Sequence, residues 1–254
     1  MARWVGADVE EAEKPIEEYG SVNAFFARHL KLGARRWPSE PELLVSPTDG
    51  TFGESGRITE GTLIQAKGIS YSATDLLGGD TDQAAIFEGG HFVTIYLAPR
   101  NYHRIHTPLP GHVVRAHHVP GRLLPVSLPA VASIDGLFAR NERLICTVAG
   151  ALGAVAVVAV GAYNVGRIST AFDPAWSGRV GGWITNRGTP PPEHRSYRDP
   201  LPVQGGQELM AFHLGSTVVL LVGAGVRLAD TVRAGRPVRV GDIIGGLEPT
   251  QQSP

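Results

Sequence analysis

Histidines gather in one part of the chain, where their spacing is the first indication of chemistry. Six of the nine lie between residues 91 and 118, namely His91, His103, His106, His112, His117 and His118. His103-x-x-His106, followed by two later histidines, has a spacing that zinc ligands can adopt. The HExxH motif is absent, however, and no carboxylate lies between Glu88 and Asp135. The sequence therefore predicts no metal site, and a buried or solvated side chain is the ordinary interpretation of each histidine.

Ser216 is the other candidate, because it follows a glycine inside an apolar run that extends from Met210 to Val222. A serine in a strand is usually an ordinary hydroxyl, and it becomes a nucleophile only when a neighbouring base takes its proton. Gly215 permits a distorted backbone that β-branched neighbours would resist. The segment Ser46-Pro47-Thr48-Asp49-Gly50 can likewise, taken alone, form a simple turn. These residues by themselves leave both the structural and the catalytic interpretation open.

Familiar cofactor and nucleophile motifs are absent from the chain. Gly223-Ala224-Gly225 follows a predicted strand, but Leu228 occupies the position at which a dinucleotide fingerprint needs its third glycine. The sequence contains neither a GxSxG nucleophile elbow nor a GxxxxGK(S/T) phosphate-binding loop. These motifs therefore give no reason to expect a bound nucleotide or an α/β-hydrolase site.

Composition indicates a globular chain that is rich in strands and turns. Of 254 residues, 43% are hydrophobic and 19% charged, while 32 are glycine and 19 proline. The formal net charge of −1 argues against nucleic acid as a partner. A single cysteine, Cys146, excludes an internal disulfide and fits a reducing compartment.

Twenty residues from Leu144 to Tyr163 carry no charge, which is long enough to nominate a transmembrane helix. Three glycines interrupt this run, and its apolar part is mostly alanine and valine. We therefore predict two buried strands, at about 143–149 and 154–160, joined by a turn. Further strands are expected at 92–97 and 111–119, and the stretch between Asp173 and Gly206 is expected to be a long loop.

The first forty residues have a different character. Ser21 can cap a helix that runs to about Ala34, with Val22, Phe25, Phe26 and Leu30 on one face. Four basic residues follow without an acidic neighbour, Arg28, Lys31, Arg35 and Arg36. Either the phenylalanine face docks on the body, or the helix lies in a membrane interface with its basic residues at anionic headgroups; partial docking would reconcile the two.

Together these observations predict a mainly β (α+β) protein. A helical, membrane-facing element is expected over residues 1–40 and a β-rich domain over residues 41–254, which the resemblance described next makes the catalytic domain.

Six short segments in the same order make the chain resemble the phosphatidylserine decarboxylase family from about residue 20 to 247. They are Asn23-Ala24-Phe25-Phe26-Ala27-Arg28, Ser46-Pro47-Thr48-Asp49-Gly50, Ala66-Lys67-Gly68, Tyr102-His103-Arg104-Ile105-His106, Leu137-Phe138-Ala139-Arg140-Asn141-Glu142-Arg143 and Leu214-Gly215-Ser216-Thr217. Each segment is weak alone, but their order and the position of the Gly-Ser pair are specific.

The resemblance implies a self-processing proenzyme that is cut between Gly215 and Ser216. The products would be a long chain 1–215 and a short chain 216–254, whose first residue becomes a pyruvoyl group. By the same resemblance, His106 is the base that activates Ser216, and Asp49 orients and stabilises the imidazolium of His106, as in other triads. His103 is assigned to the substrate pocket, where it polarises or hydrogen-bonds the carboxylate or carbonyl.

The resemblance also implies the partners and the location. The substrate would be phosphatidylserine in a membrane, decarboxylated to phosphatidylethanolamine, with no metal and no external cofactor because the pyruvoyl group is the electron sink. The protein would lie peripherally on the cytoplasmic face of the cell membrane as a heterodimer of its two cleaved chains, and a homodimer of these stays open. The short chain should remain paired with the long chain, since so few residues cannot bury a core.

Two alternatives remain at this point. The first is a β module that binds lipid and is never processed, and the second is a pyruvoyl decarboxylase for a different serine-headed lipid or a soluble amino acid. Observing self-cleavage would exclude the unprocessed binding module. Substrate assays would distinguish a decarboxylase for another substrate from one for phosphatidylserine.

Overall fold

The computed structural model describes residues 6–163, 168–173, 176, 192–213 and 216–247. The helices are short: η1 (Ile16–Glu18), α2 (Val22–Phe26), α3 (Ala73–Leu76), α4 (Thr81–Ile86), α5 (Leu128–Val131) and α6 (Leu137–Arg140). The strands are β1 (Leu43–Val45), β2 (Gly50–Arg57), β3 (Thr62–Ala66), β4 (Ile69–Ser72), β5 (His91–Leu97), β6 (Arg104–His106), β7 (Gly111–Val119), β8 (Arg143–Gly150), β9 (Gly153–Val160), β10 (Ile168–Thr170), β11 (Glu193–Val203), β12 (Glu208–Phe212), β13 (Ser216–Val222), β14 (Val226–Leu228), β15 (Pro237–Val238) and β16 (Ile243–Leu247). The predicted mainly β fold is confirmed.

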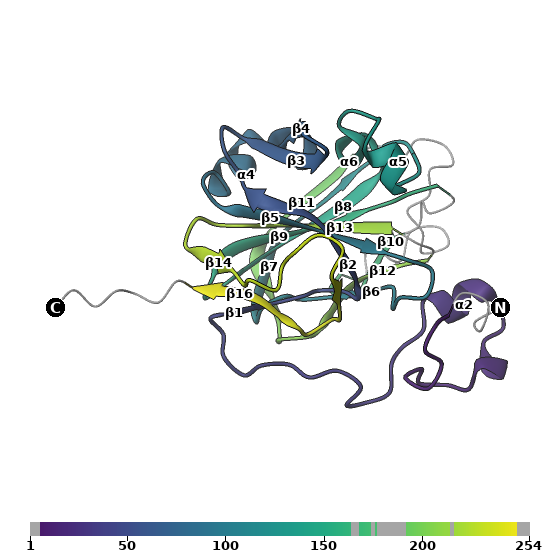
Figure 1. The fold of residues 1–254 in the computed structure, drawn as a ribbon. Helices are drawn as coiled ribbons and strands as arrows, with labels where there is room; N and C mark the ends of the chain where they lie inside the picture. Colours follow the sequence, from purple (N-terminus) through teal and green to yellow (C-terminus); the bar gives the residue numbers. More distant parts are fainter. Residues whose placement is uncertain (1–5, 164–167, 174–175, 177–191, 214–215, 248–254) are drawn as a thin grey trace.

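An eight-stranded antiparallel sheet forms the centre of the molecule, in the order β11-β7-β8-β9-β13-β5-β2-β15 (Figure 1). The uncharged run forms the hairpin β8–β9, which turns between Gly150 and Gly153. The predicted strands at 92–97, 111–119, 143–149 and 154–160 are thus confirmed. No helix among the described residues is long and apolar enough to cross a membrane.

Both faces of this sheet are buried at its centre, which explains why the strands β9 and β13 carry no charged residue. Successive residues of β9 and β13 alternate between two hydrophobic cores, as expected for a strand period of two. One core receives Val155, Val157, Ala159, Val218, Leu220 and Val222, and the other receives Ala156, Val158, Val160, Val219 and Leu221. A hydrophobic run of this length therefore needs no membrane to bury it.

Smaller elements cover the two faces. The hairpin β3–β4 and the helices α4, α5 and α6 lie on one side of the sheet, at the top of Figure 1. The three-stranded sheets β1-β16-β14 and β10-β12-β6 lie on the other side. The C-terminal part of the chain contributes strands to two sheets, because β13 and β15 belong to the central sheet while β14 and β16 belong to the sheet β1-β16-β14.

The N-terminal helix is much shorter than predicted. Ser21 caps α2 as expected, with its Oγ accepting from Ala24 N at 3.1 Å, but the helix ends at Phe26 rather than near Ala34. The guanidinium of Arg104, from β6, donates to the carbonyls of Ala27 and Arg28. These carbonyls are satisfied by a tertiary contact, which stops the helix that local propensity would continue.

The burial of the basic run corrects the membrane interpretation of its arginines. Phe25 and Phe26 are both buried, so the phenylalanine face docks on the body. Arg28 is only 3% exposed, with its guanidinium over the Phe25 ring, and the side chain of Arg35 is 8% exposed. Of the four basic residues, only Lys31 and Arg36 are exposed, so they alone could reach headgroups.

The stretch between Asp173 and Gly206, predicted as one loop, contains a strand. β11 pairs with β7 from Glu193↔His118 to Val203↔Gly111, with a register shift in between. It contains Pro200 and Pro202 and lies at the sheet edge, where a strand tolerates the loss of backbone donors. Residues 174–175 and 177–191 of the predicted loop lie outside the described residues.

We predict that Leu220→Ala lowers the free energy of unfolding by about 2–5 kcal/mol, because it removes a side chain that is fully buried in the central strand. Leu128→Ala is the control, since Leu128 is 72% exposed and should change stability by less than about 0.5 kcal/mol. Equilibrium urea unfolding measures both. Equal effects of the two substitutions would contradict the placement of β13 in the core.

Candidate active site

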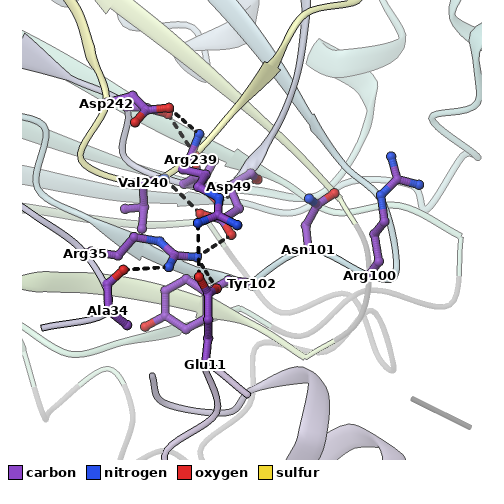
Figure 2. A network of polar contacts seen from close by, with 12 residues as sticks. Glu11, Ala34, Arg35, Asp49, Arg100, Asn101, Tyr102, Arg239, Val240 and Asp242 are labelled. Carbon is purple, nitrogen blue, oxygen red and sulfur yellow. Dashed lines mark hydrogen bonds and ion pairs between the residues drawn. The ribbon is translucent and has the colours of Figure 1, made fainter. Parts of the chain in front are cut away.

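The carboxylate of Asp49 is held from two sides. Asp49 ends the turn that precedes β2, and the residue is 8% exposed. Its Oδ1 accepts from the backbone N–H of Val240 at 2.8 Å, and its Oδ2 accepts from Nη2 of Arg35 at 2.8 Å (Figure 2). These two hydrogen bonds fix the orientation of the carboxylate.

The turn that carries Asp49 needs a glycine at its next position. A Cβ on Gly50 would lie 2.6 Å from both Cγ2 of Ile95 and the backbone oxygen of Tyr96. Gly50 therefore allows β2 to start close against β5, as the motif in the sequence suggests. The same turn is tied to β6, because the backbone N–H of His106 donates to the Pro47 carbonyl at 2.8 Å.

The hydrogen bonds of His106 determine its tautomer. Nδ1 lies 2.7 Å from the carbonyl oxygen of Gly206, which can only accept, so Nδ1 carries the proton. Nε2 then has the lone pair, and it accepts from the hydroxyl of Tyr102 at 3.0 Å. The nitrogen that could act as a base is thus Nε2, and a phenol hydroxyl covers it.

Two aromatic rings reduce the contact of His106 with water. The ring centroids of Trp37 and Tyr102 lie 5.4 Å and 5.6 Å from that of His106. Burial lowers the pKa of His106 from its ordinary value, although the bond to Gly206 and the charges of Glu208 and Asp49 act in the opposite direction. His106 is therefore a neutral base at neutral pH.

A direct bond between Asp49 and His106 is expected from the resemblance, but each side chain has other partners. Asp49 bonds with Arg35 and Val240, and His106 bonds with Gly206 and Tyr102. The backbone carbonyl of Gly206 takes the orienting position that a carboxylate has in a Ser-His-Asp triad. Asp49 acts on His106 through its charge, which raises the pKa of the imidazole.

His103 is enclosed. The residue is fully buried, its ring packs edge-on against Phe26 at 5.0 Å, and its Nδ1 bonds with the carbonyl of Asn101 at 2.8 Å. Nε2 has no hydrogen-bond partner among the residues that the structure describes. Burial lowers the pKa of His103 to about 4, so the ring stays neutral and Nε2 can only accept. The resemblance gives His103 the task of polarising or hydrogen-bonding the substrate carboxylate or carbonyl, whereas Nε2 in this tautomer is an acceptor.

Ser216 begins β13, where it pairs with Leu97 of β5. The neighbouring Leu214 and Gly215, together with the side chain of Ser216, lie outside the described residues. The position of the predicted cleavage site is therefore known only from the strand that follows it.

Sequence reasoning missed four residues at this site: Arg35, Trp37, Tyr102 and Gly206. Tyr102 had a local signal, because it lies four residues before His106 in the same motif. Arg35 had none, since a run of basic residues says nothing about a carboxylate elsewhere in the chain. Gly206 has φ of 76°, and a Cβ there would lie 2.2 Å from the Trp37 ring, so glycine is required next to His106.

Metal ligands and a reactive thiol are not found in the described part of the chain. No three histidine, cysteine, aspartate or glutamate side chains among these residues come together in a way that could hold a metal ion. Cys146 is fully buried, and burial raises the pKa of its thiol, which keeps it protonated.

A neutral, desolvated base beside a turn that carries a carboxylate, in a mainly antiparallel fold, suits acid–base chemistry by the chain's own side chains. Comparison with known proteins defines the class as decarboxylase proenzymes. The family model for phosphatidylserine decarboxylase matches residues 22–246, which is most of the chain. The chain belongs to this family.

Relatives with this name cover nearly the whole chain. The phosphatidylserine decarboxylase proenzyme of Anaeromyxobacter sp. (strain K) is 45% identical over 247 residues, covering 97% of this chain and 85% of that protein. The proenzymes of Halorhodospira halophila and Ectopseudomonas mendocina are 46% and 40% identical, over 97% and 98% of this chain and 82% and 86% of their own lengths.

The burial of His103 makes stability depend on pH. Its folded pKa of about 4 lies below the ordinary value of 6.5, so the unfolded chain binds more protons between these values. Stability is complete above about pH 6.5 and is lost as the pH falls toward about 4, by up to about 3 kcal/mol from this residue.

We predict that His103→Gln reduces this loss, as measured by chemical unfolding at a series of pH values. His112→Gln is the matched control, because His112 is exposed and should leave the acid dependence unchanged. If both variants follow the wild-type curve, His103 is not the buried neutral group described above.

Proposed function

We propose that this chain is a self-processing phosphatidylserine decarboxylase that forms phosphatidylethanolamine and carbon dioxide through a pyruvoyl group made from Ser216. The observation that carries the proposal is the state of His106, whose Nδ1 is bound to a carbonyl and whose Nε2 keeps its lone pair. Membership of the family and the proenzyme names of the relatives support it.

The proposed self-cleavage begins with Ser216. Its Oγ bonds to the carbonyl carbon of Gly215 while Nε2 of His106 takes the hydroxyl proton. The bond from that carbon to the nitrogen of residue 216 breaks, and the nitrogen takes a proton, which leaves an ester. Loss of the α-hydrogen of residue 216 then breaks its Cβ–Oγ bond and releases the Gly215 carboxylate. Water replaces the nitrogen of the resulting dehydroalanine, ammonia leaves, and a pyruvoyl group remains.

Asp49 and His106 have separate tasks in this proposal. The lowered pKa of His106 keeps Nε2 unprotonated at neutral pH, so it can take a proton at once. Asp49 stabilises the imidazolium that then forms, through its charge rather than through a hydrogen bond. His106 can return a proton later in the reaction, which makes it the candidate acid of the decarboxylation step as well.

A pyruvoyl group at residue 216 would supply an electron sink for decarboxylation. Nε2 of His103 is a buried acceptor that has no partner in the described part of the chain, and such an atom is costly unless a donor reaches it. An ammonium or amine group of the substrate is a donor of the right kind. We therefore assign His103 to the substrate amine, in place of the carboxylate.

A pocket of about 430 Å³ is our candidate for the place at which the serine headgroup enters. It lies between the N-terminal segment and β6, and its lining includes Ser21, Arg28, Arg104 and His213. His213 lies three residues before Ser216 in the chain. This mixture of hydroxyl, cationic and imidazole groups suits a zwitterionic headgroup better than an acyl chain.

We also propose that the protein acts peripherally at the cytoplasmic face of the cell membrane. Leu32 is fully exposed and lies next to Lys31, with Arg36 also exposed. An apolar side chain flanked by cations suits the boundary of an anionic lipid surface.

Intact-mass analysis under denaturing conditions tests cleavage directly. We predict two species from the wild type, with the smaller beginning at position 216 and lighter than a serine-started fragment by one ammonia. Ser216→Ala should give one species of 27.0 kDa, because no hydroxyl can attack. Ser133→Ala, which changes an exposed hydroxyl bonded only to the Pro129 carbonyl, should cleave like the wild type. A single uncleaved wild-type species would favour a binding module.

The cleaved chains should stay together in native buffer. β13 is paired with β9 on one edge and β5 on the other, while β15 pairs with β2 and β16 with β1. Size-exclusion chromatography should therefore elute both fragments in one peak, and they should separate in concentrated guanidinium chloride. Two peaks in native buffer would contradict this pairing.

A further inference from the structure

One arginine connects the candidate carboxylate to the N-terminal segment. Nη2 of Arg35 lies 2.8 Å from Oδ2 of Asp49 and 2.9 Å from Oε2 of Glu11, and Nη1 donates to the Ala34 carbonyl at 2.9 Å (Figure 2). The side chains of Arg35, Glu11 and Asp49 are 8%, 22% and 12% exposed. Water therefore screens these charges only weakly.

The other side of this network belongs to the C-terminal part of the chain. Val240 N binds Oδ1 of Asp49, and Nη1 of Arg239 lies 3.1 Å from Oε1 of Glu11. The backbone N–H of Arg239 donates in turn to Asp242 at 2.8 Å. The Asp49 carboxylate is thus held between residues that the proposed cleavage would leave on two different chains.

We propose that Arg35 is a positioning residue of the reaction, which fixes the Asp49 carboxylate and, by sharing its charge between Asp49 and Glu11, sets how strongly Asp49 acts on His106. This inference rests on the proposed function, because its effect is felt in self-cleavage. Arg35 does not itself touch the reacting atoms; it acts through Asp49.

The geometry requires arginine rather than a cation of any kind. A planar guanidinium binds the Ala34 carbonyl with one nitrogen and two carboxylates with the other. A lysine ammonium at this position could neutralise charge but could not hold three acceptors in a fixed plane. Arg35→Lys should therefore keep part of the electrostatic effect and lose part of the positioning.

Among the described residues, the charged groups that act on His106 are few. Glu208 and Asp49 raise its pKa and Arg104 lowers it, and Glu208 is itself paired with Arg104 at 2.5 Å. The Tyr102 hydroxyl stays neutral, because burial raises its pKa. Asp49 is the group on which Arg35 acts directly, so removing Arg35 changes one contribution and leaves the Glu208–Arg104 pair in place.

These charges determine in which direction the pKa of His106 changes when Arg35 is removed. Without Arg35, the Asp49 carboxylate is no longer partly neutralised, and the pKa of His106 rises. More of the imidazole is then protonated near neutral pH and unable to accept the Ser216 proton. The cleavage rate should fall as the pH decreases and His106 becomes protonated, and we call this part of the pH profile the acid limb. In Arg35→Met the acid limb should move to higher pH by about 0.5–1 unit. Loss of positioning should lower the plateau by up to about 10²-fold.

The experiment follows self-cleavage of freshly purified full-length proenzyme on denaturing gels over a series of pH values. Arg35→Met and Arg35→Lys are compared with wild type, and Asp49→Asn should move the acid limb in the opposite direction. Arg115→Met is the matched control, because it breaks a similar 2.6 Å ion pair with Asp80, between β7 and the cap of α4. It should leave both the limb and the plateau unchanged.

Each outcome has a defined meaning. If wild type cleaves and the acid limb of Arg35→Met is unshifted, the inference is overturned. It is also overturned if Arg35→Met cleaves more slowly by the same factor at every pH and has a lower melting temperature, because that combination indicates a purely structural role. Absence of cleavage in wild type overturns the proposed function instead.

A second variant covers the case in which Arg35→Met does not fold. Glu11→Gln leaves Arg35 to neutralise Asp49 alone, so the acid limb should move to lower pH. An unshifted limb in this variant would overturn the inference.

Discussion

The pairing of β13 on both edges constrains the rest of the molecule. β13 begins at Ser216 and lies between β9 and β5, with its side chains alternating into two hydrophobic cores. A strand in this position cannot leave without exposing both cores and two ladders of backbone groups. We therefore expect the fold to survive the proposed cut at the start of this strand. The chemistry proposed for Ser216 depends on a backbone that the sheet keeps in place on one side of the bond.

The site is built where segments distant in sequence meet. The turn that carries Asp49 is tied to β6 through Pro47 and His106, and to the C-terminal part through Val240. The N-terminal segment adds Arg35 and Trp37, which lie against the two candidate catalytic side chains. The segment proposed to meet the membrane is thus the same one that contacts the acid–base pair. Any movement of this segment on lipid would be transmitted to Asp49 and His106 over one or two contacts.

The parts of the fold that were predictable depend on local patterns. Strands β8, β9 and β13 could be predicted because both of their faces are buried, which removes every charge from the run. The end of α2 could not, since it depends on Arg104 from another element, and β11 was missed because an exposed edge strand has little hydrophobic alternation. The motifs nominated Asp49, His103 and His106 by resemblance, but their hydrogen-bond partners come from residues 35, 101, 102, 206 and 240. Residue 102 lies in the same motif as the two histidines and residue 101 directly precedes it, but no spacing rule connects residues 35, 206 and 240 to this motif, because these meet only in the folded chain.

The role of Gly206 changes what the carboxylate has to do. In a Ser-His-Asp triad the carboxylate both selects the tautomer of the histidine and stabilises its charged form. Here the backbone carbonyl of Gly206 selects the tautomer, and it cannot be titrated or rotated away. Asp49 is then needed only for its charge, and a charge can be adjusted from a distance by its other partners. This separation explains why an arginine can bind Asp49 without competing with His106 for it, and why the network of Arg35 and Glu11 can extend outward from the site.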